Sequence, residues 1–98
     1  MTASEPGVST CSEQFVLKNR HGLHARPAHM WVQTANAFAS QLRVARPGED
    51  PVDGKSIMGM MMLAAEHGST IEVVASGPDC DAQIRALREL VDSGFGED

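Results

Sequence analysis

The residues best suited to chemistry lie in one short segment, Arg20-His21-Gly22-Leu23-His24-Ala25-Arg26-Pro27-Ala28. The apolar spacing after it predicts a helix that begins at about His24 or Ala25, and Pro27 fits only in the first turn, where a missing N–H costs no hydrogen bond. Free amides and the positive macrodipole at a helix start attract anions, and the Arg26 guanidinium adds a planar fork of donors. Because imidazole is largely neutral and nucleophilic near pH 7, the segment predicts an anion site that contains a nucleophile, His24.

A phosphoryl group is the anion that suits this arrangement. Its transfer depends on positioning and charge stabilisation more than on acid or base groups, so a nitrogen nucleophile beside cationic donors is sufficient. Residues 18–29 contain Lys18, Arg20 and Arg26 but no carboxylate, which makes this part of an acidic chain locally basic. A histidine before a helix is nevertheless more often a cap or a solvated group. The segment alone therefore leaves both interpretations open.

The composition limits the classes of protein to which the chain can belong. Its 98 residues suit one domain, and a hydrophobic fraction of 42% with a charged fraction of 21% is typical of a folded globular protein. The formal net charge of -5 repels polyanions, which argues against nucleic acid and anionic membranes as partners. No apolar run approaches the roughly 20 residues that cross a bilayer, and the start of the chain lacks the features of a signal peptide. We therefore expect a cytoplasmic protein.

Hydrophobic periodicity predicts the order of the secondary-structure elements. It favours strands over Glu13 to Lys18, Gln41 to Ala45, near Val52 and over Ile71 to Ala75, and helices from about His24, over Ser56 to Ala65 and over Cys80 to Ser93. The apolar stripe of the first helix consists of Ala28, Trp31, Val32, Ala35 and Ala39. The β-α-β-β-α-β-α order predicts a two-layer α/β sandwich in which the helices cover one face of a single sheet. We expect residues 1–12 to form a flexible leader and residues 13–98 to form the domain.

Neither the cysteines nor the histidines form a convincing metal site. Cys11 and Cys80 are too few and too far apart in sequence for a disulfide framework, so we expect two free thiols, although one bridge between them stays open. Neither has a second cysteine at zinc-ligand spacing. His21, His24 and His29 straddle a turn and a helix start with no carboxylate between them. We therefore expect neither a metal nor a cofactor.

Two segments together resemble the signatures of one family. Gly22-Leu23-His24-Ala25-Arg26-Pro27-Ala28, followed by Val32-Gln33-Thr34-Ala35, is similar to the active-site helix of HPr, the histidine phosphocarrier of the phosphoenolpyruvate:sugar phosphotransferase system. Gly54-Lys55-Ser56-Ile57-Met58-Gly59 is similar to the segment around the regulatory serine of that family. The resemblance covers roughly Glu13 to Gly94, and it implies an open-faced sandwich in which a four-stranded antiparallel sheet carries three helices on one face.

The resemblance also implies a function and its partners. By resemblance His24 is phosphorylated on Nδ1 and Arg26 steadies the phosphoryl group. Enzyme I is then the donor, and the IIA domains of sugar permeases are the acceptors. The chain is a substrate of enzymes rather than an enzyme with its own turnover, and we expect it to be a monomer.

Ser56 is compatible with two roles. A serine before an apolar helix is more often an N-cap than a phosphorylation site. By resemblance, however, the Lys-Ser-Ile-Met-Gly sequence around Ser56 is typical of carriers that an HPr kinase/phosphorylase modifies. The two roles are compatible, because a helix N-terminus tolerates the added negative charge.

The second predicted helix has more apolar surface than one buried stripe can hold. We expect Met60, Leu63 and Ala64 in the core and Met58 and Met61 on the other side, where flexible thioethers suit a surface that meets several partners. By resemblance, the residues of the docking face are Ala25, Arg26, Ile57, Met58 and Met61.

Two alternative functions stay open at this stage. One is a regulatory carrier in the nitrogen-related branch of the same system. The other is an interaction module, such as a co-effector of a transcriptional regulator, that docks through the methionine-rich helix when Ser56 is phosphorylated. A hydrolase is least consistent with the chain, because no base and nucleophile pair is placed to close a pocket. The sequence does not name the sugar or the acceptor.

Overall fold

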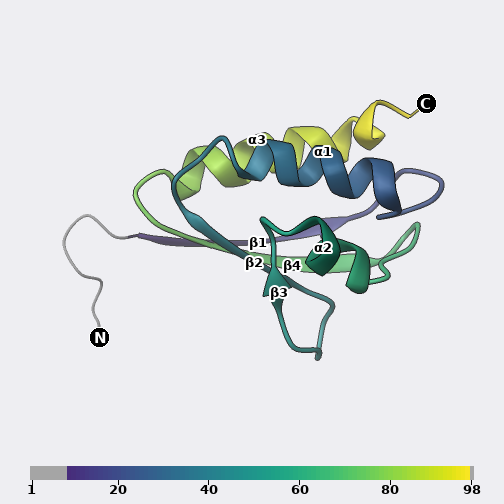
Figure 1. Cartoon of the computed structure of the whole chain (residues 1–98), viewed down its shortest axis with the longest axis horizontal. Helices are drawn as coiled ribbons and strands as arrows, with labels where there is room; N and C mark the ends of the chain where they lie inside the picture. The colour runs from purple at the N-terminus through teal and green to yellow at the C-terminus, as the bar shows by residue number, and fades with distance from the viewer. Residues whose placement is uncertain (1–8, 98) are drawn as a thin grey trace.

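Figure 1 shows the computed structural model of the chain, which describes residues 9–97. The strands are β1 (Thr10–Val16), β2 (Gln41–Ala45), β3 (Val52–Asp53) and β4 (Thr70–Ser76), and the helices are α1 (Ala25–Ala35), α2 (Ile57–Met62) and α3 (Cys80–Asp92), followed by a short 3-10 helix, η1 (Gly94–Gly96). The predicted β-α-β-β-α-β-α order is confirmed. No helix within residues 9–97 has the length and apolar character needed to cross a membrane.

The four strands form one antiparallel sheet in the order β1-β4-β2-β3. Alternate side chains of these strands are buried beneath the helices, among them Phe15, Leu42, Val44, Ile71, Val73 and Ala75. The opposite face carries polar side chains, and on it Gln14 Nε2 donates a hydrogen bond to Glu72 Oε2 at 3.4 Å. Because only one face of the sheet is apolar, the helices must cover that face. The expected open-faced sandwich is confirmed.

α1 and α3 lie side by side across the sheet (Figure 1). Trp31 is among the largest fully buried side chains of the core, and its ring meets Phe15 edge to face with 6.2 Å between the ring centroids. The indole Nε1 donates a hydrogen bond to the Gly54 carbonyl oxygen at 3.1 Å, so its one polar atom is satisfied. Trp31 thereby joins α1 to the segment that leads into α2.

The first helix is shorter than its apolar spacing predicted. α1 ends at Ala35, and Ala39 lies outside it and is exposed. The amides of Ala39 and Ser40 donate hydrogen bonds of 2.9 Å to the carboxylate of Asp79, which directly precedes α3. The hydrogen bond from the Ser40 hydroxyl, and then that from the Ala39 amide, lowers the pKa of Asp79 below its ordinary value. These bonds to the residue before α3 replace the helical bonds that Ala39 lacks.

The first strand begins earlier than predicted. β1 starts at Thr10, so Thr10, Cys11 and Ser12, which the sequence assigned to the flexible leader, pair with Ser76, Ala75 and Val74 of β4. Backbone pairing stabilises this polar stretch, and a signal based on apolar side chains does not detect it. The predicted leader residues 1–8 lie outside the described residues.

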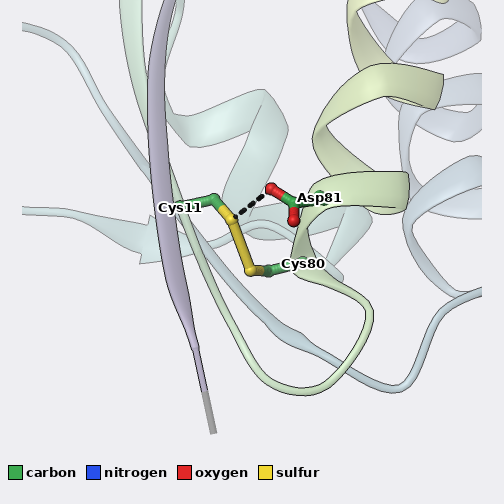
Figure 2. A group of neighbouring side chains, drawn as sticks. All are labelled: Cys11, Cys80 and Asp81. Atoms are coloured by element: carbon green, nitrogen blue, oxygen red, sulfur yellow. Dashed lines mark hydrogen bonds between the residues drawn. A yellow bond between two sulfur atoms is a disulfide. The ribbon is translucent and has the colours of Figure 1, made fainter. Parts of the chain in front are cut away.

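The expectation of two free thiols is wrong in this structure. Cys11 of β1 and Cys80 at the start of α3 form a disulfide with 5.9 Å between their Cα atoms, across a sequence separation of 69 residues (Figure 2). This Cα distance is typical of native bridges. Only the folded topology, which places α3 over β1, brings the two cysteines together.

The second helix is also shorter than predicted. Ser56 is the N-cap of α2, and its Oγ accepts a hydrogen bond from Gly59 N at 3.0 Å. Met60 and Leu63 are buried as expected, but Ala64 is exposed and the prediction for it is wrong. Ala64 has a left-handed φ of 52°, which turns the chain out of the helical path before the residue can reach the core.

A close backbone contact fixes the loop that precedes α1. Gly22 has a φ of +64°, and a Cβ atom added there would lie 2.3 Å from the Ala65 carbonyl oxygen. Beside it, Leu23 N donates a hydrogen bond to the same oxygen at 2.9 Å. Glycine has no side chain at this point, so the loop can lie directly against the chain that follows α2.

We expect Gly22→Ala to lower the free energy of unfolding by about 3 kcal/mol, since a left-handed alanine costs about 1 to 2 kcal/mol and the Leu23 hydrogen bond is lost as well. The matched control is Gly48→Ala, because Gly48 has a φ of +82° but nothing within 4 Å of an added Cβ. That control should lose only about 1 kcal/mol. Urea unfolding of both variants measures the difference, and equal losses would contradict the role given to the close contact.

Candidate functional site

His24 is the residue that immediately precedes α1. Its backbone is extended, with φ -81° and ψ -171°, and its carbonyl oxygen accepts the first helical hydrogen bond from Ala28 N at 2.9 Å. Pro27 has no N–H, so the amides without an intrahelical acceptor belong to Ala25 and Arg26. The first turn of α1 carries no acidic residue. An exposed imidazole and two amide donors therefore meet at the positive end of a helix.

The imidazole of His24 has a carboxylate partner. His24 Nε2 lies 3.1 Å from Glu97 Oε2, and the exposed fractions of the two side chains are 41% and 18%. Asn19, which is buried, donates from Nδ2 to Glu97 Oε1 at 3.2 Å and to the Gly22 carbonyl oxygen at 2.8 Å. Glu97 is thus held between the loop before α1 and the imidazole.

These contacts determine the protonation state of Glu97. The hydrogen bond from Asn19 lowers the pKa of Glu97 most, partial burial opposes that change, and the hydrogen bond with His24 lowers the pKa again. The pKa of Glu97 therefore lies below its ordinary value. The carboxylate is ionised at neutral pH and can only accept hydrogen bonds.

An ionised Glu97 selects the tautomer of His24. Because the carboxylate is an acceptor, the ring nitrogen that faces it must donate, and the proton of a neutral imidazole then resides on Nε2. The lone pair is left on Nδ1. Of the two ring nitrogens, Nδ1 is the one that can act as a nucleophile.

The end of the chain is shaped to deliver Glu97. After α3, Gly94 and Gly96 adopt left-handed φ angles of 65° and 71°, and Phe95 between them has a φ of 58°. A bulky residue rarely adopts this conformation, and here the Phe95 side chain is fully buried in the core. Burial of the ring holds the turn in place, and Glu97 N then donates to the Gly94 carbonyl oxygen at 3.0 Å.

Sequence reasoning did not identify Glu97 or Asn19. The resemblance ended at about Gly94, and the chain beyond it received no role. One signal was present in the sequence, because an aromatic residue between two glycines after a helix, Phe95 here, is typical of a chain that turns back onto the core.

The cationic side chains around the site are exposed. Lys18 pairs with Asp92 at 3.1 Å, and both side chains are more than half exposed. The Arg26 guanidinium takes part in none of the ion pairs or side-chain hydrogen bonds found within residues 9–97. Its donors are therefore available to an anion that arrives at the start of α1.

The three histidines of the segment do not form a metal-binding group. The His21 and His24 rings are edge to face with 5.6 Å between their centroids, and His29 lies on the exposed side of α1. Within residues 9–97, the cluster of potential ligands close enough to share an ion is instead Cys11, Cys80 and Asp81.

The exposed side of α2 is apolar. Ile57 and Met61 are 39% and 44% exposed, and Met58 and Met62 are 73% and 74% exposed. The contact between Leu23 N and the Ala65 carbonyl oxygen connects the loop before His24 to the chain just after this helix. Ala25 is exposed as well. The loop that leads to His24 is therefore joined to the chain after the apolar helix α2, and α2 also contacts α1.

Most of the chain matches one protein family. The family model described as "PTS HPr component phosphorylation site" matches residues 11–93. The chain belongs to the HPr family of phosphocarriers. The HPr of Neisseria meningitidis is 46% identical over 79 residues, which are 81% of this chain and 88% of that protein. The expected HPr membership and a role in phosphoryl transfer within the phosphotransferase system are thereby confirmed.

Two further relatives support the HPr assignment. The crystal structure of HPr-C-His from Thermoanaerobacter tengcongensis superposes with a TM-score of 0.85 at 42% identity, covering 90% of this chain and 98% of that one. A multiphosphoryl transfer protein of Vibrio cholerae is 40% identical over 85 residues, which are 85% of this chain but 21% of that protein. The HPr domain therefore also exists as one part of a longer chain.

The low pKa of Glu97 predicts a pH-dependent difference between the wild type and Glu97→Gln. A depressed carboxyl pKa contributes stability that is present above the ordinary pKa and is lost as the pH falls through the folded-state value. We expect the wild type to have the larger free energy of unfolding at neutral pH, and the difference to shrink as the pH falls below the ordinary carboxyl range and through the lowered folded-state pKa of Glu97.

Urea unfolding over a pH series measures this difference. Glu66→Gln is the control, because Glu66 is exposed and its carboxylate makes no ion pair within residues 9–97. A pH-dependent difference of the same size in the control would show that the loss of any carboxylate explains the result.

Proposed function

We propose that this chain carries a phosphoryl group on Nδ1 of His24, which it accepts from enzyme I and passes to IIA domains. The observation that carries the proposal is the contact of His24 Nε2 with Glu97, since it leaves Nδ1 as the nucleophile of a residue that directly precedes the free amides of Ala25 and Arg26. The family match supports the reaction class.

The transfer needs few groups. The lone pair of His24 Nδ1 attacks phosphorus, a nitrogen–phosphorus bond forms, and the bond between phosphorus and the donor breaks. The ring keeps its proton on Nε2 and gains positive charge, which the Glu97 carboxylate stabilises at 3.1 Å. The free amides and the Arg26 guanidinium face the charge on the phosphoryl oxygens. In the second transfer a nucleophile of the acceptor attacks phosphorus, the bond between phosphorus and the acceptor forms, and the nitrogen–phosphorus bond breaks with its electron pair returning to Nδ1.

The carrier has no turnover of its own in this proposal. It requires no cofactor or metal, because the donor protein supplies the activated phosphoryl group and the acceptor removes it. We place it in the cytoplasm as a monomer. Its net charge of -5 repels polyanions, which argues against nucleic acid or an anionic membrane as a partner.

The docking face in this proposal consists of Ala25, Arg26, Ile57, Met58 and Met61. The exposed thioethers of α2 adapt to partners of different shape, which suits a carrier that must meet both a donor and several acceptors. Met62 is equally exposed and extends the same surface.

Labelling with enzyme I and radioactive phosphoenolpyruvate tests the phosphorylated residue. We expect acid-labile label on the wild type and on His29→Ala, the control at an exposed histidine of the same helix, and no label on His24→Ala. Arg26→Ala should slow labelling roughly tenfold, equivalent to about 1.4 kcal/mol, whereas Arg20→Ala should have a smaller effect. Label that survives in His24→Ala would reject the assignment, and an unlabelled wild type would favour the interaction module.

We also propose that Ser56 is a regulatory phosphorylation site. Its side chain caps α2 through the bond to Gly59 N, and it directly precedes the exposed Ile57 and Met58. A phosphate there would add about -1.5 to -2 charges to the edge of the apolar docking face. The charge would oppose docking of an acidic partner surface, while the fold would persist. An HPr kinase/phosphorylase would be the modifying enzyme, and a transcriptional regulator could recognise the phosphorylated form.

Ser56→Asp and Ser56→Ala separate the regulatory role from the capping role. We expect Ser56→Asp to slow phosphoryl transfer from enzyme I and to keep the stability of the wild type, because aspartate also caps helices. Ser56→Ala should lose about 1 kcal/mol of stability and retain the wild-type transfer rate. Measured rates that follow stability rather than charge would refute the regulatory role.

A further inference from the structure

The Cys11–Cys80 pair is a second group of reactive side chains, apart from the site at His24. Cys11 lies near the start of β1, and His24 follows the loop after the other end of that strand. In Figure 1, α3 begins near the start of β1 and runs toward the C-terminus, so the cysteines and the end of α3 are at opposite ends of the sandwich. The proposed phosphoryl transfer uses neither sulfur.

We propose that Cys11 and Cys80 form a redox modification site, which exchanges reversibly between a dithiol and a disulfide with low-molecular-weight thiols of the glutathione class. A disulfide in a cytoplasmic protein is usually transient or redox-sensing. The reversibility therefore rests on the proposed cytoplasmic function, whereas the existence of the bridge does not.

The same geometry fits both oxidation states. The Cα atoms are 5.9 Å apart, so the bridge forms without movement of the backbone. Asp81 Oδ1 lies 3.0 Å from Cys11 Sγ, and Figure 2 shows the carboxylate directed at that sulfur. When the pair is reduced, the Cys11 thiol has a proton to donate to Asp81 across this distance. In the oxidised state the sulfur is bonded to Cys80 and has no proton to donate, so only the reduced state gives Asp81 a hydrogen bond from Cys11.

The two sulfurs are not equivalent toward a small thiol. Cys11 is partly exposed on an edge strand, whereas Cys80 is buried. A groove of about 240 Å³ opens beside the bridge, and it is lined by Cys11, Ser12, Glu13, Asp81, Ile84, Arg85 and Arg88. Arg88 is paired with Glu13 at 2.6 Å, and Arg85 makes no ion pair within residues 9–97. The groove therefore holds the Arg85 cation together with the Asp81 carboxylate that faces Cys11, and the exposure of Cys11 rather than the charge of the groove distinguishes the two sulfurs.

The exchange follows from this asymmetry. An external thiolate attacks Cys11 Sγ, a mixed disulfide forms there, and the bond to Cys80 breaks. Cys80 leaves as a thiolate at the N-terminus of α3, which favours the negative charge, whereas its burial and the nearby Asp81 carboxylate favour its protonation. A second external thiolate attacks the external sulfur of the mixed disulfide and releases Cys11, and both cysteines take up protons. Two external thiols become one external disulfide, and the protein disulfide becomes a dithiol.

We expect the bridge to affect the stability of the fold rather than the phosphorylation of His24. β1 is an edge strand that pairs only with β4, and the disulfide adds a covalent link from its start to α3. Because the link joins residues 69 positions apart, it restricts the unfolded chain strongly. We therefore expect the oxidised and reduced carriers to differ in resistance to unfolding and to be phosphorylated at the same rate when both are folded.

A metal site is the competing interpretation of the same cluster. Cys11, Cys80 and Asp81 place three ligand atoms within 4.8 Å of one another. Zinc would require both sulfurs as thiolates, which the disulfide excludes. The bridge in the structure favours the redox interpretation, and zinc binding becomes an outcome of the test.

The experiment is a titration of the full chain with reduced and oxidised glutathione, followed by alkylation and mass spectrometry, with and without zinc. We expect both cysteines to be alkylated in the reduced form and neither in the oxidised form, with a reversible change between the two. The melting temperature of the oxidised form should be on the order of 10 °C higher. Cys11→Ser and Cys80→Ser should each abolish the redox dependence of the melting temperature. Ser12→Ala, a change beside Cys11, is the control and should retain that dependence.

Three results would overturn the proposal. In the first, both cysteines are alkylated at every ratio of reduced to oxidised glutathione. In the second, the oxidised and reduced forms have equal melting temperatures. In the third, bound zinc keeps both thiols reduced. Labelling of His24 by enzyme I in each form is measured separately, so a failed phosphocarrier function and a failed redox site give different results.

Discussion

The contact of Gly22 with the backbone after α2 is the constraint on which the site depends. An added Cβ would lie 2.3 Å from the Ala65 carbonyl oxygen, so the loop before α1 can occupy its place only with glycine at this position. The contact fixes where α1 begins, and with it the position of the His24 imidazole and the free amides of Ala25 and Arg26. It also joins this loop to the chain just after α2, whose exposed side is apolar. One backbone approach therefore positions both the proposed nucleophile and the proposed docking face.

The other half of the site comes from the far end of the chain. Burial of Phe95 in a left-handed conformation turns the chain after α3, and Glu97 reaches His24 Nε2 as a result. Such a turn requires tertiary packing to hold it, since the conformation is unfavourable for a bulky residue. The core that stabilises the sandwich thus also determines which ring nitrogen of His24 is free. Stability and tautomer selection are properties of the same packing.

Local patterns in the sequence were sufficient to predict the order of the elements and the position of His24. The period of 3.6 residues placed Ala28, Trp31, Val32 and Ala35 on the buried face of α1, and Pro27 marked its first turn. The patterns failed where tertiary contacts decide. Backbone pairing with β4 begins β1 at Thr10, and hydrogen bonds to Asp79 hold Ala39 outside α1. The Cys11–Cys80 bridge and the His24–Glu97 contact join residues 69 and 73 positions apart, and no local pattern contains that information.

Family membership and the tautomer of the nucleophile have separate origins in this chain. The family match ends at residue 93, whereas the carboxylate that contacts His24 Nε2 belongs to Glu97. In the proposed reaction the matched region supplies the histidine, the helix start and the arginine. Glu97 would add a charge that stabilises the ring when Nδ1 is phosphorylated, because the proton on Nε2 would then be shared with an ionised acceptor. On this proposal the energy of the phosphorylated state depends in part on a residue outside the matched region, and so does the direction in which the group moves between partners.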